Sequence, residues 1–180
     1  MWSNLTTSPP ARVLVVMGVS GSGKTEVGRR LAPVLRGSFF DSDEFHPPAN
    51  IAKMSAGTPL TDDDRWPWYE RLRNEVIAPC APGETRVLAC SALKRIHRSF
   101  LRATRPEAVR FIQLLGDYDL IFARLSLRQG HFMRAELLRS QFETLEPAEG
   151  DEAMVVSIDK TPDEIVAEIV RRLEVAESNQ

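Results

Sequence analysis

Short apolar runs alternate with longer amphipathic stretches along this chain. The apolar runs lie at residues 13–17, 39–41, 87–90, 109–115 and 154–158. Each run is continuous rather than alternating, which is typical of parallel strands that are covered on both faces. The amphipathic stretches have helical spacing and lie at about residues 23–35, 61–80, 92–104, 117–129, 134–145 and 162–176. This order predicts an α/β fold, a five-stranded parallel sheet with helices on both faces.

Two segments interrupt this simple rhythm. Residues 42–85, between the second and third apolar runs, contain six prolines and are too long for a plain crossover. They predict a helical excursion over the carboxyl edge of the sheet, where open α/β sheets bind their ligands. Residues 125–140 are rich in arginine and contain Gly130, a pattern that favours a segment closing over a site. Residues 1–180, these two segments included, are expected to form a single domain, with residues 1–10 as a loose leader.

Composition narrows the class of protein. The chain has 180 residues, of which 43% are hydrophobic and 27% charged, as in soluble globular proteins. Its net charge of −2 provides no overall field for nucleic acid or an anionic membrane, so we expect neither as a partner. Two cysteines and three histidines in unrelated positions argue against structural zinc and favour a reducing cytoplasm. No apolar run approaches the length of a membrane span.

A glycine-rich motif follows the first apolar run and opens the first helix. It reads Gly18-Val19-Ser20-Gly21-Ser22-Gly23-Lys24-Thr25 and matches the P-loop pattern at every fixed position. In such a loop the backbone N–H groups point at phosphate oxygens, assisted by the helix N-terminus. Lys24 should reach the β- and γ-phosphates, and the Thr25 hydroxyl should bind Mg²⁺. The loop predicts a nucleotide site, and Pro33 predicts an early end for the helix behind it.

The remaining residues decide among the classes of P-loop protein. A GTPase would carry DxxG and NKxD motifs, and the sequence has neither. A motor or transporter ATPase would end an apolar strand in an acidic residue, whereas the run at 87–90 ends in Cys90. Asp117 follows another run, but it stands where a helix begins, which favours helix capping. These absences favour a small kinase.

An acid pair after the second apolar run fits that class. Asp41 and Asp43 are two residues apart, so their carboxylates lie on the same side of an extended segment. One carboxylate can hold Mg²⁺ while the other accepts the proton of the acceptor hydroxyl. The alternative is a turn in which each aspartate bonds its own backbone.

Several motifs together resemble the gluconate kinase family. They are GVSGSGKT at residues 18–25, DSDEFHP at 41–47, NIAKM at 50–54, GTPLTDDDRWPW at 57–68, CSALK at 90–94, GHF at 130–132 and SQFETLE at 140–146. The resemblance runs from about residue 13 to 158. It implies a P-loop kinase fold related to shikimate and nucleoside monophosphate kinases, a homodimer, and an enzyme that makes 6-phosphogluconate from ATP and D-gluconate.

The acceptor in that reaction is a polyol carboxylate, which requires a cation and hydrogen-bonding groups. Arg65 is a substrate candidate supported by the family pattern, while residues 62–64 before it are interpreted as the acidic N-terminus of a capped helix. Lys94 and Arg98 are candidates because they follow the carboxyl end of the third strand. A solvated helix face is the alternative for that stripe, and His97 is expected at the surface.

Further candidates surround the expected site. His46, at its mouth, is expected to hydrogen-bond gluconate, and His131 could close over the acceptor. Arg124 and Arg128 flank the arginine-rich segment and are expected to contact ATP, with helix-solubilising charge as the alternative. By analogy with related folds, the adenine base is expected near residues 160–162.

The expected mechanism is direct in-line phosphoryl transfer. Thr25 and Asp41 would hold Mg²⁺, and Asp43 would accept the proton, with Asp41 next in line for that role. Lys24 and Arg128 would neutralise the moving phosphoryl group. Two alternatives stay open: a kinase for shikimate or a nucleoside monophosphate, and a nucleotide-binding regulator without transferase activity.

Overall fold

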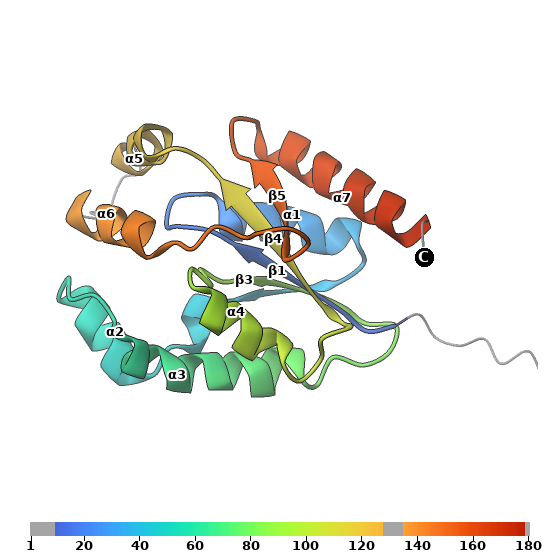
Figure 1. Ribbon diagram of the computed structural model, residues 1–180, viewed down its shortest axis with the longest axis horizontal. Helices are drawn as coiled ribbons and strands as arrows, with labels where there is room; N and C mark the ends of the chain where they lie inside the picture. Colours follow the sequence, from blue (N-terminus) through green and yellow to red (C-terminus); the bar gives the residue numbers. More distant parts are fainter. Residues whose placement is uncertain (1–9, 128–134, 179–180) are drawn as a thin grey trace, which may run out of the picture.

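A computed structural model describes residues 10–127 and 135–178, and its centre is one parallel sheet (Figure 1). The five strands are ordered β2-β3-β1-β4-β5, and every neighbouring pair is parallel. Their bounds are β1 Arg12–Met17, β2 Ser38–Asp41, β3 Thr85–Ala89, β4 Val109–Leu115 and β5 Ala153–Ser157. The predicted fold class is therefore confirmed. Each predicted apolar run coincides with a strand, and their first and last residues agree to within two positions.

Helices connect the strands and cover both faces of the sheet. The α-helices are α1 Lys24–Val34, α2 Pro48–Ser55, α3 Asp62–Arg71, α4 Arg95–Arg102, α5 Tyr118–Ser126, α6 Ala135–Thr144 and α7 Pro162–Ser178. A 3-10 turn, η1 (Ser42–Phe45), follows β2, and a π-helical stretch, η2 (Leu72–Ile77), continues α3. The helix α1 ends one residue after Pro33, as the sequence predicts.

The central strand β1 contributes to two separate cores. Leu14 and Val16 are fully buried against α1, α7 and their neighbours. Val13 and Val15 are fully buried on the other face, against α3, η2 and α4. Alternate side chains of one strand therefore enter different cores, which explains why its sequence is apolar throughout.

The excursion between β2 and β3 consists of η1, α2, α3 and η2, and it packs back onto the sheet. Trp68 and Tyr69 are buried in the core on that face, and the Trp68 indole donates to the Ser42 carbonyl at 2.7 Å. Thr61 and Asp64 form a reciprocal capping box at the start of α3. These contacts fix α3 beside the segment that carries the acid pair. The Asp117 side chain caps α5 by accepting from the Leu120 N–H at 2.8 Å.

Both cysteines are buried free thiols. Burial raises the pKa of Cys90 to about 12 and also raises the pKa of Cys80. Among residues 10–127 and 135–178, the structure has no helix that is both long and apolar enough to span a bilayer.

Candidate active site

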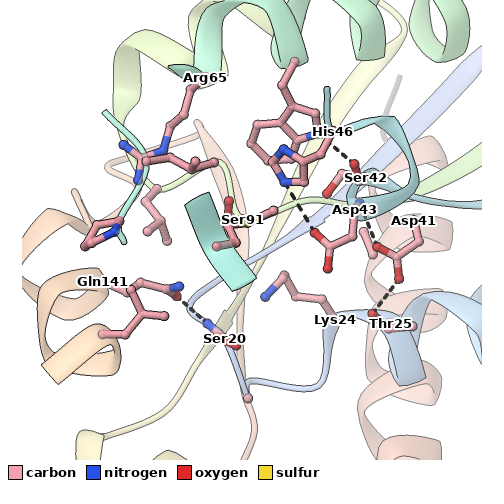
Figure 2. Close-up of a pocket in the computed structure, with 18 of the residues that line it drawn as sticks. Ser20, Lys24, Thr25, Asp41, Ser42, Asp43, His46, Arg65, Ser91 and Gln141 are labelled. Carbon is pink, nitrogen blue, oxygen red and sulfur yellow. Dashed lines mark hydrogen bonds and ion pairs between the residues drawn. The ribbon is translucent and has the colours of Figure 1, made fainter. Parts of the chain in front are cut away.

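A cavity of about 710 Å³ opens at the carboxyl edge of the sheet. Its walls come from the loop between β1 and α1, the segment after β2, the region of α2 and α3, and helix α6. Figure 2 shows that the labelled side chains from these segments converge on one space. Parallel strands place their carboxyl ends at this edge, so chemistry from separate loops meets there.

The glycine-rich loop has the backbone shape that its sequence predicts. Gly21 has φ of 81°, and a Cβ at this position would lie 2.7 Å from the Leu125 side chain. Glycine is required there both by conformation and by space. The Lys24 ammonium group donates to the Val19 carbonyl at 2.9 Å, and α1 begins at Lys24. The helix N-terminus therefore opens directly onto the cavity.

The acid pair lies beside this loop, on the same edge of the sheet. The Thr25 hydroxyl donates to Asp41 Oδ2 at 2.9 Å, and Asp41 Oδ1 accepts the Asp43 N–H at 3.1 Å (Figure 2). The Asp43 side chain is 85% exposed and faces the cavity. Partial loss of hydration and the charge of Asp41 raise the pKa of Asp43, while Lys24 opposes that change. The structure therefore combines one carboxylate bound to the loop with a second that is open to ligand.

His46 forms the wall next to Asp43. Its ring stacks on Trp68 with centroids 4.1 Å apart, and its Nε2 lies 3.9 Å from Asp43 Oδ1. Burial, followed by the charge of Arg65, lowers the pKa of His46 to about 4. The imidazole is therefore neutral near pH 7 and suits hydrogen bonding better than charge pairing.

Two of the predicted substrate cations share one carboxylate. The Lys94 ammonium group lies 2.6 Å from Asp62 Oδ2, and the Arg65 guanidinium lies 3.3 Å from Asp62 Oδ1. The hydrogen bond from Lys94 is the main cause that lowers the pKa of Asp62. Arg65 lines the cavity. Lys94 does not, but it is hydrogen-bonded to Asp62, the same residue that Arg65 contacts. Asp62 therefore pairs with two cations, in addition to its place as an acidic residue at the N-terminus of α3.

Two predictions on α4 are wrong. Arg98 is only 1% exposed, and its guanidinium is paired with Glu152 at 2.7 Å and with the carbonyls of Ala92, Leu93 and Glu146. It does not reach the cavity, because a buried arginine with these partners is held within the protein. His97, expected at the surface, is also buried and stacks on Tyr69 with centroids 4.6 Å apart. The amphipathic pattern located the helix but did not identify the face that packs inward.

The remaining candidates lie away from the described cavity wall or outside the described residues. Arg124 donates to the Ile158 carbonyl at 2.7 Å and is not part of the wall. Arg128 and His131 belong to residues 128–134, which lie outside the described residues. Ser91 and Gln141 line the cavity, although the sequence predicted no role for either. A signal for Gln141 was present, since it belongs to the SQFETLE motif.

Comparison with known proteins places these features in a family. The family model described as shikimate kinase matches residues 20–174. The chain is 48% identical over 145 residues to the thermosensitive gluconokinase of Escherichia coli K12, covering 81% of this chain and 77% of that protein. It is 42% identical over 167 residues to the thermoresistant gluconokinase of the same organism, covering 92% and 95%. A crystal structure of a gluconokinase from Sinorhizobium meliloti 1021 superimposes with a TM-score of 0.86 and 41% identity, covering 95% and 96%.

Proposed function

Because this chain belongs to the gluconokinase family of P-loop kinases, we propose that its cavity transfers the γ-phosphoryl group of ATP to the terminal hydroxyl of D-gluconate. One observation carries the assignment beyond the resemblance. The phosphate loop and the acid pair line the same cavity and are joined by the bond between Thr25 and Asp41. A loop suited to hold a phosphate donor and a carboxylate suited to accept a proton thus line one space.

Residues 18–25 form the triphosphate site in this proposal. Their N–H groups and the start of α1 face the phosphates, and Lys24 exchanges its bond to the Val19 carbonyl for phosphate oxygens. Three backbone N–H groups of the loop already have partners within the protein: that of Ser20 donates to the Gln141 side chain, and those of Gly18 and Ser22 donate to the carbonyls of Ser91 and Val19. The remaining N–H groups of the loop carry the contact.

Thr25 and Asp41 would hold Mg²⁺. A hydroxyl and a carboxylate 2.9 Å apart are the hard oxygen ligands that this ion prefers, and a kinase site needs few of them because phosphates supply the rest. Among the described residues no cluster of three or more acidic, histidine or cysteine side chains forms a metal cage, in keeping with such a sparse site. When bound there, the ion neutralises charge on the phosphate oxygens.

Asp43 acts as the base in the transfer step. The terminal hydroxyl oxygen of gluconate attacks the γ-phosphorus and loses its proton to Asp43, a P–O bond forms, and the bridging P–O bond to ADP breaks with its electron pair. Lys24 neutralises the charge that develops on the moving group. The accessible, partly dehydrated carboxylate of Asp43 supports this role better than the bonded carboxylate of Asp41 does.

The opposite wall would hold the sugar acid. Arg65 faces the cavity and supplies the cation for the gluconate carboxylate. Lys94 pairs with the same Asp62 carboxylate as Arg65 and so adds a second positive charge to this wall. His46, neutral and beside the base, contributes a hydrogen bond close to the reacting hydroxyl. A single acidic substrate with several hydroxyls matches this combination of a cation at the cavity wall and neutral polar groups.

Other parts of the proposal extend beyond the cavity. Arg124 and Arg128 would contact ATP, and His131 would contact the acceptor. The chain would act as one P-loop kinase domain, with residues 42–85 on the acceptor side and residues 125–140 closing over the site, and it would pair as a homodimer. Two free thiols in the described chain support a reducing cytoplasm.

An acceptor panel tests the function. The purified protein is supplied with ATP, Mg²⁺ and either gluconate, shikimate or a nucleoside monophosphate, and release of ADP is measured. Turnover with gluconate should exceed turnover with the others. Faster turnover with another acceptor would refute the substrate, and ATP binding without ADP release on any acceptor would favour a regulator.

A further inference from the structure

Gln141 connects the nucleotide loop to the opposite side of the cavity. It lies on α6, 121 residues from Ser20 in the sequence, and its Oε1 accepts the Ser20 N–H at 2.7 Å (Figure 2). This is a short, well-formed hydrogen bond to a backbone group of the P-loop. The side chain therefore contacts the loop that carries ATP while also lining the cavity for the acceptor.

The bond to Ser20 determines which end of the carboxamide faces the cavity. A backbone N–H can only donate, so Oε1 points at the loop and Nε2 points elsewhere. Nε2 has two donors, and neither finds a hydrogen-bond partner in the described part of the chain. Gln141 is only partly buried, so these donors are open to a ligand in the cavity.

The helix that carries Gln141 is also fixed just beyond its C-terminal end. Just beyond α6, the N–H of Glu146 donates to the Leu93 carbonyl at 2.9 Å, and its carboxylate accepts the Arg95 N–H at 2.6 Å. The helix is thus tied to the start of α4, next to the acceptor-side cation Lys94. The bond to Ser20 and the contacts of Glu146 together hold Gln141 at a defined place between the loop and the acceptor wall.

We propose that Gln141 positions the sugar acid, with the P-loop orienting its carboxamide and Nε2 donating to a hydroxyl oxygen of the acceptor. An uncharged donor suits an uncharged hydroxyl, whereas the phosphates have Lys24 and the loop N–H groups. The inference rests on the proposed function, because gluconate supplies the hydroxyl.

Two substitutions separate this role from simple support of the loop. Gln141→Met removes both the acceptor and the donors at nearly constant size. Gln141→Glu keeps an acceptor for the Ser20 N–H but removes the donors. If Nε2 binds the sugar acid, both variants should raise the KM for gluconate about tenfold, the usual effect of one lost hydrogen bond. Glu143→Gln, at an exposed position on the same helix, is the matched control. It should leave the KM for gluconate and the KM for ATP unchanged.

Monodeoxy analogues of gluconate identify the bonded hydroxyl. For the wild-type protein, one analogue should lose about tenfold in kcat/KM because it lacks the hydroxyl that Gln141 binds. With Gln141→Met, the same analogue should be used no worse than gluconate itself. A KM for ATP that rises while the KM for gluconate stays constant would overturn the proposal, as would an equal penalty for every analogue in both proteins. Absence of gluconate turnover in the wild-type protein would instead refute the proposed function.

Discussion

The nucleotide side and the acceptor side of this cavity are built in different ways. The nucleotide side comes from eight consecutive residues whose glycines, lysine and threonine have fixed positions in one loop. The acceptor side is assembled from η1, α2, α3 and α6, which extend over about 100 residues of the sequence. The geometry of the nucleotide side is determined by residues that are consecutive in the sequence. The geometry of the acceptor side depends on which side chains from separate elements pair after folding.

The cations on the two sides illustrate that difference. Lys24 bonds to a carbonyl of its own loop, a neutral partner that phosphates can replace. Arg65 and Lys94 both bond to the charged side chain of Asp62. Arg65 lies one turn further along the same helix, whereas Lys94 lies just before α4. A ligand on the acceptor side therefore enters a set of ion pairs that is already formed, whereas on the nucleotide side Lys24 donates to a neutral carbonyl and its charge acts on Asp43.

The largest effect is expected where the two sides meet, at Asp43. Asp43→Asn should lower kcat about 10²- to 10⁴-fold because the amide cannot accept the hydroxyl proton. Binding of a non-hydrolysable ATP analogue should stay nearly unchanged, as the loop is intact. Steady-state kinetics and calorimetric titration measure the two quantities. Turnover comparable to that of the wild-type protein would move the base to Asp41.

A second variant separates structural from substrate-binding arginines. Arg98→Met removes a buried guanidinium and leaves the Glu152 carboxylate, 17% exposed, without its main partner. The free energy of unfolding should fall by about 3–5 kcal/mol, measured by urea denaturation. The KM for gluconate should not change in the protein that folds.

Should Arg98→Met fail to fold, Arg98→Lys keeps the charge and gives a milder loss. An increased KM with undiminished stability in either variant would return Arg98 to the substrate site.

The contrasting substitution is Arg65→Ala. Arg65 lines the cavity and is bonded to Asp62 near the surface, so its removal should cost little stability. The KM for gluconate should rise about 10- to 100-fold, while the KM for ATP stays constant. Equal changes in both constants would show that the two sides are not separable at this residue.

The most gradual effect concerns pH. Burial is the main cause that lowers the pKa of both His46 and His97 to about 4. Between about pH 6.5 and pH 4 the unfolded chain binds protons that the folded chain does not. The free energy of unfolding should therefore fall as the pH falls through this window, by up to about 1.4 kcal/mol per pH unit for each histidine.

Urea midpoints at several pH values measure this slope, and His97→Phe should reduce it by about half. The substitution retains a ring against Tyr69 and removes one titrating group. An unchanged slope in His97→Phe would show that other groups cause the pH dependence.

The sequence predicted the strands, the phosphate loop and the acid pair because each depends on residues close together in the chain. It also predicted the caps of α3 and α5, whose partners are three residues apart. It misplaced Arg98 and His97 because their partners, Glu152 just before β5 and Tyr69 on α3, lie far away along the chain. Gln141 was overlooked for the same reason, since its partner Ser20 belongs to a different element.

The two buried thiols have a practical consequence. Maleimide and iodoacetamide dyes react with thiolates, and neither Cys80 nor Cys90 presents one at neutral pH. A single cysteine introduced at an exposed position, such as Glu143, can therefore be labelled without first removing the native ones. Fluorescence from such a probe would report directly, and in real time, on how α6 responds when each substrate arrives.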